Sequence, residues 1–244
     1  SDVFLVSYPR SGNTWCRVIL AHLLYPDFTL QTLDGLHAYI PGIYRLIFPD
    51  RIYSQPRIIK THQAFHQRLG KKDDQLYRKN IYIVRNVFDV AKSYYQYRRD
   101  RGQDHGLTYD DFAQRMAYGI YGPGTWQEHI KSWYGANQYF GKVLFVRYED
   151  LMHDPIKEIA RMAEFLGHPQ KEEVYQRIAN KSSIENMRLA QERGAIEGKT
   201  NFIRSTHVRS GELHLSAATR DLLYEHNAWA LERFGYTKED SFQD

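Results

Sequence analysis

Short apolar runs alternate along this chain with segments whose apolar residues recur every three or four positions. The first run, VFLV at residues 3–6, is typical of a fully buried strand. Small, polar and turn-forming residues fill positions 7–13. The apolar residues that come next have helical spacing and are Trp15, Val18, Ile19 and Leu23. The opening pattern therefore predicts a strand, a tight loop and a helix.

The same alternation continues along the rest of the chain. Three more short, largely apolar runs predict strands at residues 57–62, 81–84 and 143–147. Helical spacing and capping residues predict helices at 87–95, from 108, at 126–133, 155–166, 171–179 and 217–235. Strands that alternate with helices in this way predict an α/β fold with a parallel sheet.

The loop after the first strand carries groups that suit an anion. Arg10 adds a positive charge, Ser11 adds a hydroxyl, and Gly12 has access to backbone conformations denied to other residues. We expect Thr14 to cap the helix, whose N-terminus points free backbone N–H groups at the loop. The segment therefore predicts a phosphate-binding loop, with an ordinary β–α turn as the alternative. The GxxxxGK[ST] spacing of nucleoside-triphosphate P-loops is absent, because no Lys-Ser or Lys-Thr follows Gly12.

Composition narrows the class of protein. The 244 residues are 42% hydrophobic, enough for one large domain, which we expect to span residues 1–244. The net charge of +4 suits an anionic ligand. The sequence contains no long run of like charges, so we do not expect a basic tail that binds nucleic acid. Cys16 is the only cysteine, so we expect no intrachain disulfide and a cytoplasmic location. The sequence shows no signal peptide and no apolar stretch of the ~20 residues that a membrane span needs, so we expect no membrane association. An anchor in a longer precursor is left open as an alternative.

Polar residues at the ends of the second and third strands are candidates for chemistry. Lys60 and His62 are two positions apart, so an extended chain turns both to the same side. Open parallel sheets bind ligands beyond the carboxyl ends of their strands. A lone histidine is usually structural, and the chain has 11, but the neighbouring lysine favours a catalytic role for His62. Arg85 follows the third strand, and Ser93 lies two turns into the next helix, where it could face the same strand end.

Residues 8–15, YPRSGNTW, resemble the YPKSGTTW signature of sulfotransferases, which bind the 5′-phosphosulfate end of 3′-phosphoadenosine 5′-phosphosulfate (PAPS). Arg10 replaces lysine and Asn13 replaces threonine. The resemblance implies a P-loop-like three-layer α/β fold, with a central, mostly parallel sheet of about four or five strands flanked by helices. It assigns to the 5′ end of PAPS the residues Arg10, Ser11, Gly12, Asn13, Thr14 and Trp15.

Other segments resemble this family in the same order along the chain. The KTH sequence at 60–62 resembles the motif that holds the family's catalytic base, and residues 81–97 resemble the segment whose Arg and Ser, here Arg85 and Ser93, bind the 3′-phosphate. The YEDL sequence at 148–151 implies that Tyr148 and Trp15 line the adenine. The resemblance adds to the nucleotide pocket Ser182, Ser183 and Ile184, where Ile184 replaces the family's usual phenylalanine, and Arg209, Ser210 and Gly211.

Two of these assignments have alternatives. Ser182 with Glu185 also fits a capping box at the start of a helix. Residues 208–212 resemble a shortened RKGxxGDW without its GDW part, so Arg204 competes with Arg209 for the 3′-phosphate. Both alternatives are left open by the sequence.

The resemblance implies in-line transfer of a sulfuryl group from PAPS to a hydroxyl, or an amine, of a small organic acceptor, with 3′-phosphoadenosine 5′-phosphate (PAP) as product and no metal. His62 would act as general base, and Arg10 and Lys60 would stabilise the developing charge. Alternatives are a P-loop kinase or NTPase, a catalytically silent adenosine-nucleotide-binding module, and a nucleic-acid-binding protein.

The acceptor is not identified by the sequence. We expect its walls in the loops at 35–49, 63–70, 100–107 and 118–126, where Tyr121 or Trp126 could contact the acceptor. For the tryptophan, packing in the core is the favoured alternative. The unperiodic segment 27–56 is apolar and aromatic, which suits either an acceptor wall or core packing. The sequence gives no indication of the oligomeric state.

Overall fold

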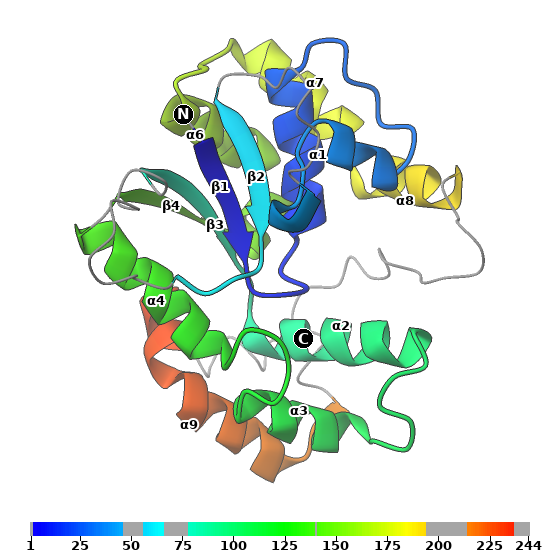
Figure 1. Cartoon of the computed structure of the whole chain (residues 1–244), viewed down its shortest axis with the longest axis vertical. Coiled ribbons are helices and arrows are strands. Elements are labelled where there is room, and N and C mark those ends of the chain that lie inside the picture. Colours follow the sequence, from blue (N-terminus) through cyan, green and yellow to red (C-terminus); the bar gives the residue numbers. More distant parts are fainter. Residues whose placement is uncertain (1, 46–55, 66–77, 140, 194–213, 237–244) are drawn as a thin grey trace.

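In the computed structural model, the described residues are 2–45, 56–65, 78–139, 141–193 and 214–236. They contain one sheet of four strands, β1 (Asp2–Ser7), β2 (Arg57–Thr61), β3 (Lys79–Val84) and β4 (Lys142–Arg147), in the order β2-β1-β3-β4. Every pair of neighbouring strands is parallel (Figure 1). The predicted α/β sheet is therefore confirmed, and the four strands fall at the predicted places.

Helices cover both faces of this sheet, as expected for a three-layer fold (Figure 1). Leu5, Ile58 and Ile81 point to one face and pack against α1 (Asn13–Leu24), α6 (Pro155–Leu166), α7 (Glu172–Lys181) and α8 (Ile184–Arg193). Val6 and Tyr82 point to the other face and pack against α2 (Val87–Asp100), α3 (Tyr109–Ala117), α4 (Trp126–Tyr139) and α9 (Ala217–Arg233). Alternate residues of each strand thus supply two separate cores.

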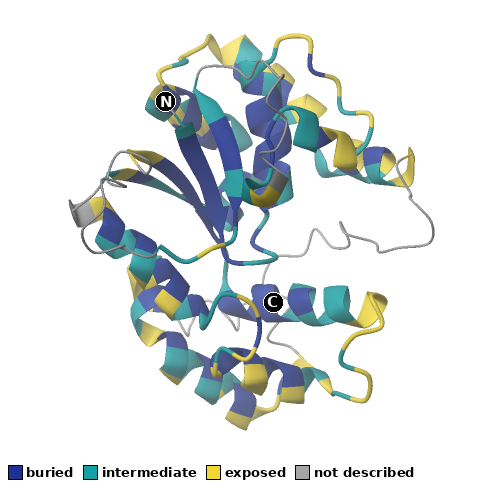
Figure 2. Cartoon of the chain, in the orientation of Figure 1, coloured by how far each residue is buried: buried dark blue, intermediate teal, exposed yellow. Residues whose placement is uncertain are grey.

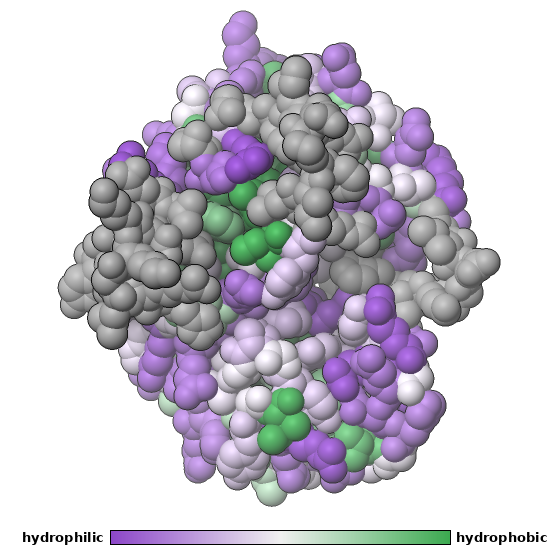
Figure 3. Space-filling model, in the orientation of Figure 1, coloured by the Kyte–Doolittle hydropathy of each residue, from purple (hydrophilic) through white to green (hydrophobic). Residues whose placement is uncertain are grey.

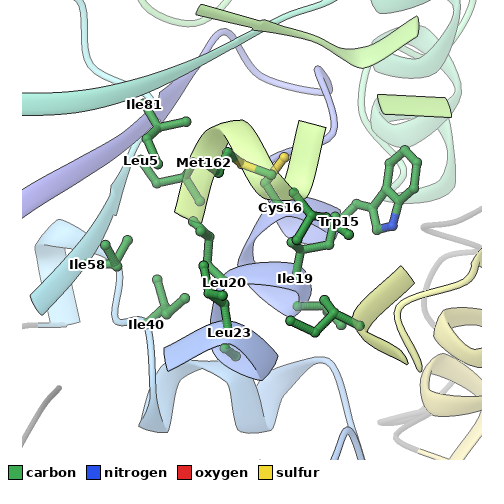
Figure 4. Packing of buried hydrophobic residues seen from close by; sticks show 14 of the residues in the cluster. Leu5, Trp15, Cys16, Ile19, Leu20, Leu23, Ile40, Ile58, Ile81 and Met162 are labelled. Carbon is green, nitrogen blue, oxygen red and sulfur yellow. The ribbon is translucent and has the colours of Figure 1, made fainter. Parts of the chain in front are cut away.

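The first of these cores lies between the sheet and α1. Figure 4 shows Leu5, Ile58 and Ile81 from the strands against Ile19 and Leu20 from the helix. Both Ile19 and Leu20 are fully buried, so α1 is held by close packing along its length. The loop that precedes α1 is consequently attached to a rigid helix at one end and to the central strand at the other.

Polar and charged residues cover the outside of the helices. Figure 2 shows buried residues concentrated in the strands and on the inner sides of the helices, and Figure 3 shows a mostly hydrophilic face with small hydrophobic groups. Within the described residues, no helix is both long enough and apolar enough to cross a membrane.

Side-chain caps explain where several of the helices begin. Thr108 and Asp111 form a reciprocal capping box at α3, Asp154 caps α6 ahead of Pro155, and Ser216 caps α9, all as predicted. Thr14 is not the cap of α1. The helix begins at Asn13 after Gly12, whose φ of 94° is left-handed and suits glycine best.

The remaining helices are short. Residues 148–153 form α5 (Tyr148–His153), directly after β4. The described part of segment 27–56 contains the 3₁₀ helices η1 (Asp34–Ala38) and η2 (Ile43–Arg45). Leu36 and Ile40 from this segment are fully buried against the first core, so here the core-packing interpretation is confirmed.

The topology leaves a crevice at the carboxyl end of β1. The helix after β1, α1, lies on one face of the sheet, and the helix after the neighbouring β3, α2, lies on the other. Two adjacent strands whose helices depart to opposite faces cannot cover the edge between them. The predicted phosphate loop and Arg85 both lie at this edge.

Candidate functional site

A cavity of about 600 Å³ occupies the crevice beyond the strand ends. It is bounded by the loop before α1, the end of β2, one face of α2, and residues of α5 and α8. The side chains that line it include Arg10, Asn13, Thr14, Trp15, Lys60, His62, Arg85, Ser93, Tyr148 and Ile184. The structure thus brings together predicted residues from five separate segments of the chain.

Hydrogen bonds of Tyr8 and Asn13 fix the loop at residues 8–12 to neighbouring parts of the fold. The Tyr8 hydroxyl lies 3.2 Å from the carbonyl oxygen of Tyr121 and 3.1 Å from that of Gly124. The Asn13 amide donates to Ser7 Oγ at 3.3 Å and to the Leu5 carbonyl at 3.4 Å. Arg10 has a φ of 70°, an unusual value for a residue with a Cβ. The loop is therefore a fixed structure with a strained turn, as binding sites often are.

Gly12 is required by its neighbour as well as by its own conformation. A Cβ built on Gly12 would lie 2.5 Å from Cδ2 of Tyr148. The ring of Tyr148 also packs edge-on against Trp15, with ring centroids 5.6 Å apart. The glycine therefore lets α5 approach the phosphate loop closely and brings the predicted adenine wall beside it.

Substituting Gly12 by alanine is expected to destabilise the protein. The left-handed φ costs ~1 kcal/mol for alanine, and overpacking against Tyr148 adds ~1–3 kcal/mol. Gly167→Ala is the matched control, because Gly167 has a φ of 78° but nothing within 4 Å of the added Cβ. Urea unfolding of both variants measures the difference, and equal losses of unfolding free energy would contradict the steric role of Tyr148.

Ser11 and Arg85 each have a buried polar atom near the loop. Ser11 is fully buried, and its Oγ has no hydrogen-bond partner among the described residues. Nε of Arg85 is likewise buried and has no partner in the described part of the chain. Buried donors are normally satisfied. Arg85 lines the cavity, so its guanidinium suits an anion there, whereas Ser11 is not among the lining residues.

Arg10 and Ser93 connect the two predicted anion sites. Nε of Arg10 donates to Ser93 Oγ at 3.1 Å, and its guanidinium lies over the ring of Tyr97 at 4.7 Å. The side chain thus extends from the loop toward α2. The sequence predicted Arg10 at one phosphate and Ser93 at the other, and the structure places them in direct contact.

Arg85 lies between the loop and Tyr148. Its guanidinium sits over the Tyr148 ring at 4.2 Å from the centroid, and its Nη1 donates to the Arg10 carbonyl at 3.5 Å. The nearest Asp89 oxygen is 3.8 Å from Nη2. A guanidinium stacked on an aromatic ring and close to one carboxylate is held in place while keeping N–H groups for a ligand.

Glu149 fixes the turn that follows β3 and carries Arg85. This residue was not identified from the sequence. Its carboxylate accepts from the Asn86 backbone N–H at 2.9 Å and from the Tyr236 hydroxyl at 2.7 Å. Burial raises the pKa of Glu149. The turn that carries Arg85 is thereby tied to α5 and to the end of α9.

Trp15 and the residues around 182–184 form the wall on the α8 side. Nε1 of Trp15 donates to the Ser182 carbonyl at 2.8 Å. The Ser182 hydroxyl donates to Ile178 within α7 at 2.7 Å, and Ser183 Oγ accepts from the Asn186 N–H at 3.3 Å. Both serine hydroxyls therefore bond at helix ends. The cap of α8 is formed by Ser183 with Asn186 rather than by the expected Ser182 with Glu185. Ile184 lines the cavity.

His62 follows β2 directly, and its ring is oriented by β1. Nδ1 lies 2.8 Å from the Ser7 carbonyl oxygen. A carbonyl only accepts, so Nδ1 carries the proton and Nε2 has the lone pair. Burial, together with the nearby positive charges of Lys60 and Arg10, lowers the pKa of His62 to about 3. His62 is therefore neutral near pH 7 and in the tautomer a general base requires.

Lys60 lies in the same cavity wall and is also perturbed. Burial, with the charge of Arg17 as the second cause, lowers the pKa of Lys60 to about 8. Arg17 is itself buried, lines the cavity and donates to the Ile40 carbonyl at 2.7 Å. The lysine is thus mostly protonated at pH 7 but titrates within one to two units of it.

Sequence reasoning missed several cavity residues, including Arg17, Asp89, Lys92 and Met187. A helical-face argument could have found two of them. Arg17 lies one turn after Asn13, and Asp89 lies one turn after Arg85 and one turn before Ser93. The predicted residues Arg209, Ser210 and Gly211, and the competing Arg204, lie outside the described residues.

Comparison with known proteins identifies the family of this chain. The family model of the sulfotransferase domain matches residues 1–235. Sulfotransferase 1A1 from Bos taurus is 30% identical over 197 residues, which cover 77% of this chain and 66% of that protein. Sulfotransferase 1E1 from Homo sapiens is 30% identical over 204 residues, with the same two coverages. The chain thus spans 66% of the length of these curated relatives.

Solved structures with a similar fold include two complexes with PAP. Mouse sulfotransferase SULT7A1 complexed with PAP has a TM-score of 0.74 and 24% identity, covering 97% of this chain and 88% of that one. Retinol dehydratase in complex with androsterone and PAP has a TM-score of 0.77 and 20% identity, covering 95% of this chain and 80% of that one. At these identities the likeness establishes the three-layer fold.

Proposed function

Because this chain belongs to the sulfotransferase-domain family, we propose that it transfers a sulfuryl group from PAPS to a hydroxyl, or an amine, of a small organic acceptor. One observation carries the proposal. A single cavity contains a neutral imidazole, His62, with its lone pair on Nε2, and two cationic side chains, Arg10 and Arg85, which we assign to the two phosphate groups. A base beside two anion sites suits a doubly phosphorylated nucleotide and an acceptor that must lose a proton.

Residues around the cavity would hold the different parts of such a nucleotide. Ser11, the backbone N–H groups at the start of α1 and Arg10 would bind the 5′ end. Arg85 and Ser93 would bind the 3′-phosphate, with Tyr148, Trp15 and Ile184 as the wall for the adenine. Arg209, Ser210 and Gly211 belong to this proposal on their sequence motif alone. When bound, PAPS supplies the sulfuryl group.

His62 is proposed to remove the acceptor proton through Nε2. The bond from Nδ1 to the Ser7 carbonyl fixes the ring and stabilises the imidazolium that forms when Nε2 takes up the proton. An anion bound beside Arg10 and Lys60 offsets the two cations that depress the pKa of His62, so the imidazole becomes a stronger base in the complex.

Arg10 and Lys60 are proposed to stabilise the negative charge that develops during transfer. Arg10 stays charged throughout because a guanidinium does not deprotonate in proteins, so its role is electrostatic rather than acid catalysis. Lys60, with its lowered pKa, is the one of the two able to donate a proton.

Calorimetric titration without metal tests the proposed function. PAP is expected to bind with micromolar or tighter affinity, AMP and ATP much more weakly, and PAPS is then screened with small alcohols, phenols and amines. ATP binding as tight as PAP binding would indicate a kinase or NTPase. Tight PAP binding without turnover of any acceptor would favour the catalytically silent nucleotide-binding module.

The pH dependence of PAP binding is expected to report Lys60. An anionic ligand favours the ammonium form, so PAP binding should take up a proton near pH 8 and weaken as pH rises above 8, where the free enzyme loses that charge. The 3′-phosphate is fully ionised there, since its second pKa is ~6. Titration in two buffers of different ionisation enthalpy measures the uptake, and Lys60→Arg, which does not titrate, should abolish it. The same uptake in the variant would assign the proton elsewhere.

The small-molecule acceptor and the cytoplasmic location are further parts of this proposal. Retinol dehydratase, a structural neighbour, was solved in complexes with androsterone and PAP and with retinol and PAP. Androsterone and retinol are small organic alcohols, the acceptor class proposed here. Cys16, the only cysteine, is buried as a free thiol, which suits a reducing compartment.

A further inference from the structure

Residues 62–65 leave the sheet at the end of β2 and are held by side chains of α4. The His62 carbonyl accepts from Nε2 of His129 at 3.1 Å. The Gln63 carbonyl accepts from Nε1 of Trp133 at 3.0 Å, and the Phe65 N–H donates to Ser132 Oγ at 2.9 Å. Three side chains of one helix therefore replace the strand ladder that ends at Thr61.

These three side chains form one rigid row. Positions 129, 132 and 133 are spaced i, i+3, i+4, so they share one face of α4. Ser132 Oγ also donates to the His129 carbonyl at 2.7 Å, which turns its lone pairs toward the Phe65 N–H. Trp133 is almost completely buried. The backbone after β2 is thus attached to a packed helix rather than to solvent-exposed chain.

His129 is the member of the row that touches the His62 backbone, and both of its nitrogens are occupied. Nε2 must donate, because its partner is a carbonyl. Nδ1 is then the acceptor, and the hydroxyl of Tyr82 donates to it at 2.7 Å. Both His129 and Tyr82 are 0% exposed. His129 is therefore a neutral imidazole of one tautomer that joins β3 to the backbone of residue 62.

We propose that His129 is a positioning residue for the proposed reaction, holding the His62 main chain so that Nδ1 reaches Ser7 and Nε2 faces the acceptor. His62 is fixed at two points, its ring by the Ser7 carbonyl and its own carbonyl by His129. Release of the second point lets the peptide turn and moves the ring. Displacement of a catalytic group by about 1 Å costs up to ~100-fold in rate. The inference rests on the proposed function for its kinetic consequence.

The test compares His129→Leu with His129→Gln. Leucine removes both bonds at similar volume, whereas the glutamine amide can still donate from near the Nε2 position. We expect His129→Leu to lower kcat by ~10- to 100-fold with the Kd for PAP unchanged, and His129→Gln to recover most of the loss. Tyr82→Phe removes only the hydroxyl that donates to Nδ1 and should have a smaller effect in the same direction.

A second readout does not depend on turnover. Nitrogen-15 NMR of the ligand-free protein reports which ring nitrogen of His62 carries the proton. We expect a single Nδ1–H tautomer in the unmodified protein and His129→Gln, and a mixture in His129→Leu. Unchanged His62 signals in His129→Leu, or equal losses of kcat and PAP affinity with a lowered Tm in both variants, would overturn the positioning role. If no acceptor is ever turned over, the proposed function fails, and the tautomer measurement still decides this inference.

Discussion

Replacing His62 by alanine or asparagine is expected to lower kcat by ~100-fold or more while leaving the Kd for PAP nearly unchanged. Asparagine is the sharper variant, because its amide nitrogen can still donate to the Ser7 carbonyl as Nδ1 does. It can preserve that contact while removing Nε2 and its lone pair. Turnover with PAPS and an acceptor from the screen measures kcat, and calorimetry measures PAP binding.

His22 supplies a control for the loss of a histidine. It lies on α1 against Phe28, with ring centroids 4.6 Å apart, and does not line the cavity. Burial, with Lys181 as a second cause, lowers the pKa of His22 to about 4, so its electrostatic situation resembles that of His62. His22→Asn should retain turnover. Parallel losses of kcat and PAP affinity in His62→Asn would argue that His62 shapes the nucleotide site instead of acting as a base.

The second large effect is expected at Arg85. Arg85→Ala should weaken PAP binding by ~10- to 150-fold, which corresponds to the ~1.5–3 kcal/mol of a hydrogen bond to a charged group. The affinity for AMP, which lacks the 3′-phosphate, should change little. The ratio of the two Kd values therefore isolates the contact to the 3′-phosphate from any general loosening of the cavity.

Arg147 is a matched control for Arg85. It ends β4 as Arg85 follows β3, stacks on Tyr236 at 4.7 Å, and pairs with Asp150 at 3.3 Å. It does not line the cavity. Arg147→Ala removes a stacked and paired guanidinium of the same kind, so the ratio of PAP to AMP affinity should stay at its original value. An equal fall in AMP and PAP affinity in Arg85→Ala would refute the proposed 3′-phosphate contact.

Much of the fold follows from local sequence patterns. Buried strands appear as unbroken apolar runs, and the caps at Thr108, Asp154 and Ser216 are local hydrogen bonds between near neighbours in sequence. The cap of α1 was predicted at Thr14 and lies two residues earlier, at Gly12. The reason is tertiary, since Gly12 must turn sharply where the ring of Tyr148 approaches, a residue far away in the sequence.

The candidate site was predictable in its residues but not in its contacts. Motifs identified Arg10, Ser93 and His62, but spacing says nothing of the bond from Arg10 to Ser93 or from His62 to Ser7. The hydroxyl of Ser182 illustrates the opposite case, because it is bonded within α7 although its sequence motif suggests a ligand contact. Side-chain partners across the fold depend on packing that no short window of sequence contains.

The order of the strands has a consequence for how the protein folds during synthesis. Among the four described strands, β1 is made first, yet it lies inside the sheet, and its partners β2 and β3 begin only at Arg57 and Lys79. The phosphate loop gains its aromatic neighbour later still, when Tyr148 follows β4 out of the ribosome. Such non-local pairing is slow and leaves the earliest strand exposed for longest. A nascent chain stopped before β4 should therefore show no affinity for PAP, and the nucleotide would act as a ligand only of the late, four-stranded form.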